Sequence, residues 1–251
     1  MSTLACRILD AFEKTPFAKD AVVCLWGDHG WHLGDNDQWA KMTNYEHATK
    51  IPLMIGCGGG ACSGRSKAMV EAIDMMPTLL EEAGIKIPTC PTNAKASRKT
   101  MLCTEGKSLS SLLRKPSTPD DPDAASYSQF PRPEHPSKQP ALSGFDLLCQ
   151  SEGNVKKGSC PNKMGYTIRT AGYRYTAWVG FNKCSNSSCP DVLADWNTWY
   201  GEELYNHSTA LLVGGKDSYD VETVNIANAT GAQAVKAKLL KQLKAFNTKG
   251  F

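Results

Sequence analysis

The residues most suited to chemistry lie in residues 27–41, where a carboxylate, an imidazole and an ammonium group are close in the sequence. Asp28 and His29 are adjacent on a turn with a glycine on each side, and Lys41 ends the stretch. A carboxylate and an imidazole on such a turn can point at one metal ion or anion, and lysine adds a positive charge. The pattern predicts a site for an anionic substrate. A solvated Asp-Gly turn is the alternative.

These residues follow an apolar run that has the length of a buried strand. Residues 21–26 (AVVCLW) are continuously apolar and include β-branched residues, which predicts a central parallel strand buried on both faces. A second strand is expected at residues 51–55, before a glycine-rich loop at 56–64. Polar residues just past the carboxyl end of a strand lie where open α/β sheets bind ligands. The N-terminal part is therefore expected to be of the α/β class.

Helix signals occur near both ends of the chain and after the second strand. Residues 3–14 and 232–246 have amphipathic spacing. Residues 74–84 begin with Asp74 as a capping residue, have a proline in the first turn and end at a glycine, which predicts a helix. Residues 88–140 are rich in Pro, Ser, Lys and Asp and are expected to be mostly loop, with FPRPEHP too proline-dense for a helix or a central strand.

The C-terminal part has strand signals of a different kind. Residues 166–170 and 173–181 are β-rich runs separated by Ala-Gly, which predicts an antiparallel hairpin, and residues 204–205 are expected to add a strand. The sequence therefore predicts two domains, a β/α domain at 1–134 and a smaller α+β domain at 135–251.

Composition excludes several classes of protein. The 251 residues carry 28 Lys and Arg against 25 Asp and Glu, and a net charge of +3 is too weak to indicate nucleic acid or an anionic membrane as partner. An apolar fraction of 41% is too high for a disordered chain. No apolar run approaches the roughly 18 residues of a membrane helix. We expect a globular protein with no nucleic-acid partner and no membrane span.

Cysteine usage and glycosylation patterns indicate the secretory pathway. The chain has ten cysteines and three N-glycosylation acceptor patterns, at Asn186, Asn206 and Asn228. The N-terminus lacks the features of a signal peptide. We therefore expect a lysosomal or secreted glycoprotein whose native start precedes Met1.

Five segments, in order along the chain, resemble the sulfatases of the alkaline-phosphatase-like superfamily, and within them the iduronate-sulfatase branch. They are GDHGWHLGDNDQWAK, EAIDMMPTLLEEAGIKIP, YSQFPRP, MGYTIRTAGYRYTAWVGFN, and GEELYNHS continued by YDVETVNIAN. The first is similar to the second metal-binding segment of the family. The resemblance implies the C-terminal part of a sulfatase mixed sheet flanked by helices, followed by a smaller α+β subdomain with an antiparallel sheet.

The resemblance also implies roles for single residues. Asp28 and His29 correspond to metal-site residues for one divalent ion, usually Ca²⁺, and Lys41 to a cation that contacts the sulfate. Lys41 and His29 are thus the expected catalytic residues. Because calcium prefers oxygen ligands, contact of His29 with the sulfate is the alternative to metal binding. Trp31 is expected beside the sugar, with a packing role as the alternative.

Three residues of the predicted hairpin are further candidates for substrate binding. The resemblance places Arg169, Arg174 and Trp178 in a subdomain that covers the substrate pocket, where arginine can pair with a uronate carboxylate. A surface arginine on a hairpin is the alternative. The other histidines have no ligand spacing and are expected to be solvated or packing residues: His32, His47, His135 and His207.

The nucleophile of the family has no counterpart in this sequence. Sulfatases convert a cysteine in C-x-P-S-R or C-x-A-x-R to formylglycine, and none of the ten cysteines lies in such a pattern. Cys62-Ser-Gly-Arg65 comes nearest, with its arginine one position early. The paired N-terminal aspartates of the family are also missing. The chain is therefore expected to be a C-terminal fragment, inactive by itself, with the formylglycine in the other half.

The resemblance gives the cysteines a structural use. Cys90 and Cys103 bracket a 12-residue loop where the related enzymes have a disulfide, so that bridge is predicted. Closing such a loop contributes about 3 kcal/mol in the chain-entropy model. Metal binding by cysteines is the alternative, although no C-x-x-C pair occurs. Two local bridges are further candidates: Cys57–Cys62 and Cys184–Cys189.

The function that the resemblance implies is hydrolysis of a sulfate ester. The expected substrate is a sulfated uronic acid of heparan or dermatan sulfate, which makes a sulfated glycosaminoglycan the expected partner. Two other functions stay open. One is a truncated, non-catalytic protein that keeps a sulfated-glycan-binding surface. The other is a phosphate-ester hydrolase of the same superfamily.

Overall fold

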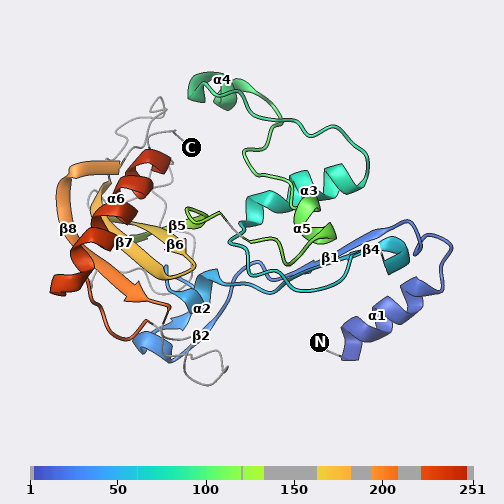
Figure 1. Ribbon diagram of the computed structural model, residues 1–251, viewed down its shortest axis with the longest axis horizontal. Coiled ribbons are helices and arrows are strands. Elements are labelled where there is room, and N and C mark those ends of the chain that lie inside the picture. The colour runs from blue at the N-terminus through green and yellow to red at the C-terminus, as the bar shows by residue number, and fades with distance from the viewer. Residues whose placement is uncertain are drawn as a thin grey trace, which may run out of the picture. The chain divides into compact units, whose positions relative to one another are not determined.

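The computed structural model describes most of the chain, as the coloured ribbon in Figure 1 shows. The described residues are 3–60, 62–119, 121–132, 163–181, 194–208 and 222–247. None of the helices in these residues is long and apolar enough to cross a membrane.

The chain forms two compact units. The first consists of Met1–Asp28 and Ile51–Ala124, and the second of His29–Lys50 and Ala125–Phe251. Residues 29–50, which carry most of the candidate site, thus group with the C-terminal part of the chain. The division into domains at residue 134 stays a prediction.

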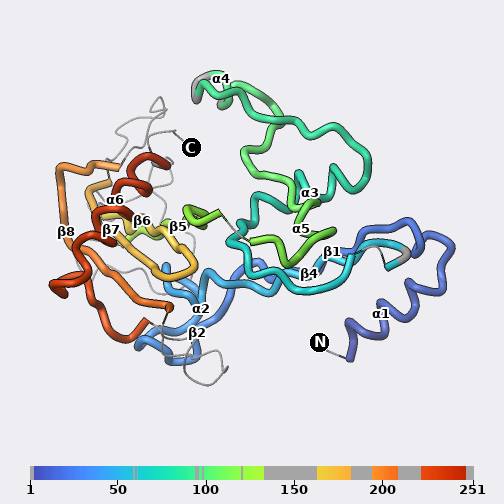
Figure 2. The backbone as a smooth tube through the Cα atoms, in the orientation of Figure 1, coloured from blue at the N-terminus to red at the C-terminus, as the bar shows by residue number. Residues whose placement is uncertain are grey.

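The first unit contains a two-stranded sheet of β1 (Val22–Trp26) and β4 (Leu53–Cys57). The two strands run antiparallel, with Val22 opposite Cys57, and lie side by side in the tube of Figure 2. The prediction of a parallel strand buried on both faces is wrong, because a continuous apolar run indicates a strand but not the direction of its partner. The ends of these strands are also accessible, with Trp26 47% exposed.

The helices predicted in this unit are confirmed. Helix α1 spans Thr3–Glu13 and α3 spans Met75–Glu82, directly after a 3-10 turn at Ala72–Asp74. The carboxylate of Asp74 accepts the backbone N–H of Glu71 at 2.9 Å in a capping box. Gly84 has a φ of 69°, a left-handed conformation that ends the helix as its sequence indicates.

The region predicted as mostly loop contains two short helices and strand β5 (Ala125–Arg132), none of which the sequence indicated. The helices are α4 (Ala94–Lys99), capped by the side chain of Asn93, and α5 (Ser110–Arg114). Such short helices carry too few apolar residues to show a period.

Two disulfides tie the first unit together. Cys90 is bonded to Cys103 and Cys57 to Cys62, as expected. The Cys57–Cys62 bond starts at the last residue of β4 and spans a 3-10 turn at Gly58–Gly60. The candidate pair Cys184–Cys189 lies outside the described residues.

The second unit is built on a four-stranded antiparallel sheet in the order β5-β6-β7-β8. The predicted hairpin and the added strand are confirmed. β5 is an edge strand, which explains how it accommodates Pro131, a residue without an N–H for the ladder. The strands span Ala125–Arg132, Lys163–Thr170, Tyr173–Phe181 and Ala194–Asn206.

The core of this unit lies between the sheet and helix α6 (Gln233–Asn247), as predicted for the last helix. Alternate residues of β6 and β7, such as Ile168 and Tyr175, are fully buried and pack with Leu239 and Leu243 of α6. Figure 1 shows α6 lying over the strands. A 3-10 turn at Thr230–Ala232 precedes the helix.

Residues 43–49 contact the other side of the sheet. The side chain of Asn44 donates a hydrogen bond to the carbonyl of Gly165 at 2.9 Å. Glu46 pairs with Arg169 and Arg174, which stand opposite each other on β6 and β7. The sheet therefore has α6 on one face and the end of the 29–50 segment on the other.

Candidate active site

A small hairpin positions the candidate residues of the second unit. β2 (His32–Leu33) pairs antiparallel with β3 (Trp39–Ala40), with His32 opposite Ala40. A 3-10 turn at Asp35–Asp37 joins them. The register places Lys41, which follows Ala40, beside the residues that precede His32. Ala40 has a φ of 65°, a left-handed conformation that costs an L-residue about 1–2 kcal/mol.

The two predicted catalytic residues are in direct contact. The ammonium group of Lys41 donates a hydrogen bond to Nε2 of His29. On the other side of the ring, Nδ1 of His29 lies 2.7 Å from the carbonyl oxygen of Gly30. A carbonyl only accepts and an ammonium only donates, so the hydrogen of the imidazole is on Nδ1 and the lone pair of Nε2 faces Lys41. The pair forms a cationic group suited to an anion.

Trp31 lies beside this pair. Its ring centroid is 5.9 Å from that of His29, and the side chain is 53% exposed. An exposed indole next to a cationic group can serve as an apolar platform for one face of a ligand. Asp28 is exposed and is the last residue of its segment in the first unit, directly before His29 in the sequence.

Helix α2 (Glu46–Thr49) holds the turn that carries His29. The N–H of Gly30 donates to the carbonyl of Ala48 at 2.9 Å. A Cβ at position 30 would lie 1.9 Å from the carbonyl oxygen of His47, so only glycine allows the turn to approach the helix this closely.

A buried ion-pair network anchors α2 to the sheet. Glu46 accepts hydrogen bonds from Arg169 at 2.9 and 3.2 Å and from Arg174 at 2.5 Å. Arg174 also pairs with Glu222, whose carboxylate accepts the N–H of Glu46 at 2.6 Å and contacts His207 at 2.9 Å. Thus the helix behind the His29 turn is fixed through charged groups of β6 and β7.

The network keeps both acidic groups ionised. Burial alone would raise the pKa of Glu46, but the hydrogen bond from Arg169 and the charges of both arginines outweigh it and hold that pKa at about 2. Burial also opposes ionisation of Glu222, and the charge of Arg174 and the hydrogen bond with His207 lower its pKa in spite of it.

The three hairpin candidates, Arg169, Arg174 and Trp178, form their hydrogen bonds with glutamates and not with His29 or Lys41. Arg174 is only 2% exposed and its guanidinium is shared between two carboxylates. Arg169 also pairs with Glu46, while the indole N–H of Trp178 donates to Glu203 at 2.8 Å. Their part in substrate binding stays a prediction.

The sequence reasoning missed Glu46 and Glu222. A buried arginine needs a carboxylate partner. The signal was the pair of arginines at facing positions of the predicted hairpin. Like charges at such a short cross-strand distance repel each other, which indicates that acidic residues lie nearby.

Comparison with known proteins identifies the family. The Sulfatase family model matches residues 5–85, which include the whole 27–41 stretch. Human iduronate 2-sulfatase is 31% identical over 243 residues, covering 82% of this chain and 40% of that protein. The chain belongs to the sulfatase family. It spans less than half the length of this relative.

Other comparisons agree with this family. A sulfatase of Formosa agariphila is 39% identical over 80 residues, which cover 32% of this chain and 16% of that protein. Among solved structures, the phosphonate monoester hydrolase SpPMH from Silicibacter pomeroyi has a TM-score of 0.63 at 24% identity, over 99% of this chain and 39% of that one. This likeness shows the fold, which is the α/β sulfatase fold expected from the sequence.

The donor groups can be compared with the divalent metal that sulfatases use. Asp28 offers an exposed carboxylate, the ligand type that a hard cation such as Ca²⁺ prefers. Both ring nitrogens of His29 are engaged, one by Gly30 and one by Lys41. Asp28 therefore has the ligand type that suits the ion, whereas His29 would have to release one of these contacts to bind either the ion or the sulfate. Both roles stay predictions.

The glycosylation patterns lie at different kinds of position. Asn228 is exposed, and Asn206 is half-buried at the end of β8, where its side-chain oxygen accepts the N–H of Ser208 at 2.8 Å. Asn186 lies outside the described residues. Glycan attachment at all three stays a prediction.

Proposed function

We propose that the protein acts in the hydrolysis of sulfate esters on uronic acid residues of glycosaminoglycans such as heparan or dermatan sulfate. The observation that carries the proposal is the His29–Lys41 contact, which lies within the stretch matched by the Sulfatase family. The similarity to iduronate 2-sulfatase supports the uronate as the sugar. A lysosomal or secreted location belongs to the same proposal.

Each residue of the site has a role in this proposal. The ammonium of Lys41 contacts the sulfate oxygens and offsets charge that builds on them during reaction. His29 orients Lys41 and lies at the sulfate, while Trp31 packs against the sugar ring. Asp28 holds the divalent ion, proposed to be Ca²⁺, and when bound that ion polarises the sulfate group.

A second function is a sulfated-glycan-binding protein without catalysis. The observation that favours it is the sequence itself, in which no cysteine lies in the C-x-P-S-R or C-x-A-x-R pattern that provides formylglycine. Binding by Lys41 and Trp31 does not depend on that nucleophile.

One experiment separates the two functions. The 251-residue chain, with Ca²⁺ present, is given a disaccharide that ends in a 2-sulfated iduronate and, in parallel, the same disaccharide without sulfate. Sulfate release and binding are both measured. Release, or binding of the sulfated sugar that requires Ca²⁺ and is lost in Asp28→Asn, supports the hydrolase site. Preferential binding of the sulfated sugar without release that depends on neither Ca²⁺ nor Asp28 supports the glycan-binding protein. Equal or absent binding of the two sugars, without release, contradicts both.

A further inference from the structure

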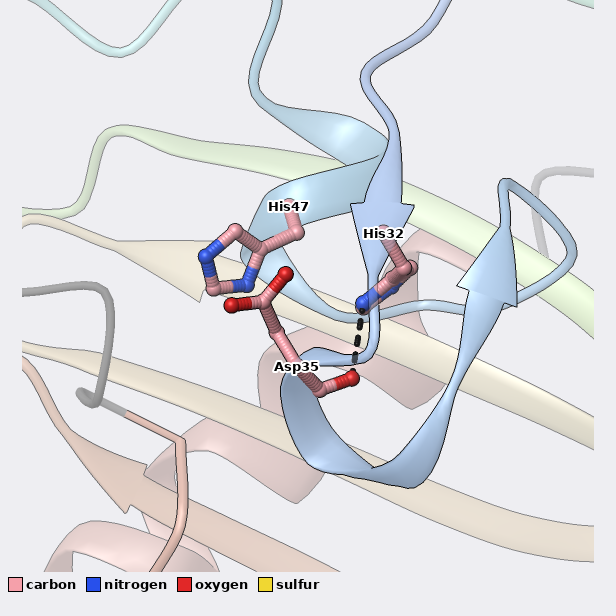
Figure 3. Close-up of side chains that lie close together, drawn as sticks. All are labelled: His32, Asp35 and His47. Carbon is pink, nitrogen blue, oxygen red and sulfur yellow. Dashed lines mark hydrogen bonds between the residues drawn. The ribbon is translucent and has the colours of Figure 1, made fainter.

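A second group of ligand-type side chains lies on the small hairpin and on α2. His32 belongs to β2, Asp35 begins the 3-10 turn, and His47 is in α2. Their potential ligand atoms all lie within 4.8 Å of one another. Figure 3 shows the carboxylate of Asp35 beside the imidazole of His47, with His32 approaching from the strand.

Among the described residues another group has a similar composition, but its surroundings differ. It consists of Glu46, His207 and Glu222. The guanidinium of Arg174 already contacts both carboxylates, and its positive charge would repel a cation. No arginine or lysine is paired with Asp35 among the ion pairs of the described residues.

His32 is fixed in place by contacts to both of its ring nitrogens. It is fully buried, and its Nε2 lies 2.8 Å from the hydroxyl of Thr43. Nδ1 lies 3.2 Å from the carbonyl oxygen of Asp35, and because a carbonyl only accepts, Nδ1 carries the hydrogen while the Thr43 hydroxyl donates to Nε2. For metal binding the hydrogen moves to Nε2, which then donates to Thr43 and leaves the lone pair of Nδ1 for the ion. Metal-binding histidines commonly have such a partner on the second nitrogen. Burial lowers the pKa of His32, which favours the neutral ring that a metal requires.

The other two groups of the site are half-buried. The carboxylate of Asp35 accepts the N–H of Leu33 at 3.1 Å, a bond that lowers the pKa of Asp35 and keeps it ionised. The ring of His47 is half-buried, with its centroid 5.4 Å from that of His32. A tetrahedral zinc site has bonds of about 2.0–2.1 Å, so these two side chains must move inward by rotation on binding.

We propose that His32, Asp35 and His47 form a binding site for a divalent transition-metal ion of the Zn²⁺ type. Two imidazole nitrogens and one carboxylate oxygen suit zinc, with water as the fourth ligand, whereas Ca²⁺ selects oxygen ligands. The ion is distinct from the one proposed at Asp28. It would link the hairpin to α2 and thereby stiffen the segment that carries Trp31 and Lys41.

Zinc titration of the full chain tests this site. Calorimetry is done on the 251-residue protein with Asp28→Asn as background, so that an ion at the proposed catalytic site is not counted. We expect one Zn²⁺ per chain, not displaced by excess Ca²⁺, and a rise in the melting temperature of about 5 °C or more at saturation. Asp35→Asn and His47→Gln should each weaken binding at least tenfold. Asp37→Asn, the same change in the same turn, should leave it unchanged.

The folded state of each variant is checked by circular dichroism. His32 is left intact because its burial makes its loss a packing defect. Co²⁺ in place of Zn²⁺ gives a second readout, since its visible spectrum reports tetrahedral coordination and should vanish with His47→Gln. The proposal is overturned if no zinc binds, if Asp28→Asn removes the binding, or if folded Asp35→Asn and His47→Gln bind zinc as tightly as the background protein.

Discussion

Lys41 donates a hydrogen bond to Nε2 of His29. Nε2 can accept it because the other ring nitrogen, Nδ1, carries the hydrogen and donates to the carbonyl of Gly30. The register of the β2–β3 hairpin creates this contact by returning residue 41 to the start of the segment. One positive charge is thereby held at the ring of His29, whose centroid lies 5.9 Å from that of the exposed Trp31.

Removing that charge should weaken binding of sulfated sugars. A charge-assisted hydrogen bond contributes about 1.5–3 kcal/mol, so Lys41→Gln should reduce affinity for the sulfated disaccharide by about 10- to 100-fold. Affinity for the sugar without sulfate should not change. Lys50→Gln is the control, because Lys50 is an exposed lysine at the end of the same segment. Equal losses in both variants would mean that overall charge, not this site, binds the sulfate.

The close approach of Gly30 to α2 leads to a second prediction. In Gly30→Ala the added Cβ would meet a backbone carbonyl at 1.9 Å, so the turn must shift. We expect a loss of about 1–3 kcal/mol in the free energy of unfolding, together with weaker binding of the sulfated sugar. Urea unfolding measures the first effect. Gly231→Ala, where a Cβ meets nothing within 4 Å, is the matched control and should keep both properties.

The network around Glu46 should be sensitive to loss of its charge. Glu46→Gln leaves Arg169 and the 2%-exposed Arg174 short of a carboxylate. Breaking a buried pair in this way costs about 3–5 kcal/mol. The exposed Glu81 provides the control, and Glu81→Gln should stay within about 0.5 kcal/mol of the native protein. A Glu46→Gln protein as stable as this control would show that the network adds no stability.

The same network predicts how stability depends on pH. The pKa of Glu46 falls from its ordinary 4.5 to about 2 on folding, so its contribution is complete above about pH 5 and is lost as the pH falls towards 2. A shift of this size corresponds to about 3 kcal/mol. Urea unfolding between pH 6 and pH 3 should show the decline, with a shallower slope in Glu46→Gln. Identical slopes in the two proteins would contradict the assignment.

Local signals made part of this fold predictable from the sequence. The helix at Met75–Glu82 is preceded by an aspartate and has an early proline and a glycine after its end, signals that all lie within a few residues of it. The hairpin of β6 and β7 follows from alternation of residues on either side of a short turn. The direction of β1 was not predictable, because it depends on a partner strand that begins at Leu53.

The site shows the same limit. Adjacent residues such as Asp28 and His29 stand out in the sequence, and the contact of His29 with Lys41 lies within one hairpin. The hydrogen bond from the backbone N–H of Glu46 to the carboxylate of Glu222 joins positions 176 residues apart, so no spacing rule reveals it. His32 and His47 meet only because Gly30 lets the turn pack against α2.

The disulfide between Cys90 and Cys103 should stabilise the first unit through its effect on the unfolded chain. The bond closes a loop across a sequence separation of 13, so its loss should cost about 3 kcal/mol in the chain-entropy model. The double variant Cys90→Ser/Cys103→Ser tests this by urea unfolding without reductant. Cys6→Ser removes an exposed free cysteine and should have little effect. Reductant should then destabilise the native protein more than the double variant, which retains only the shorter Cys57–Cys62 bridge among those described. Equal sensitivity of the two proteins to reductant would show that the Cys90–Cys103 bond makes no measurable contribution.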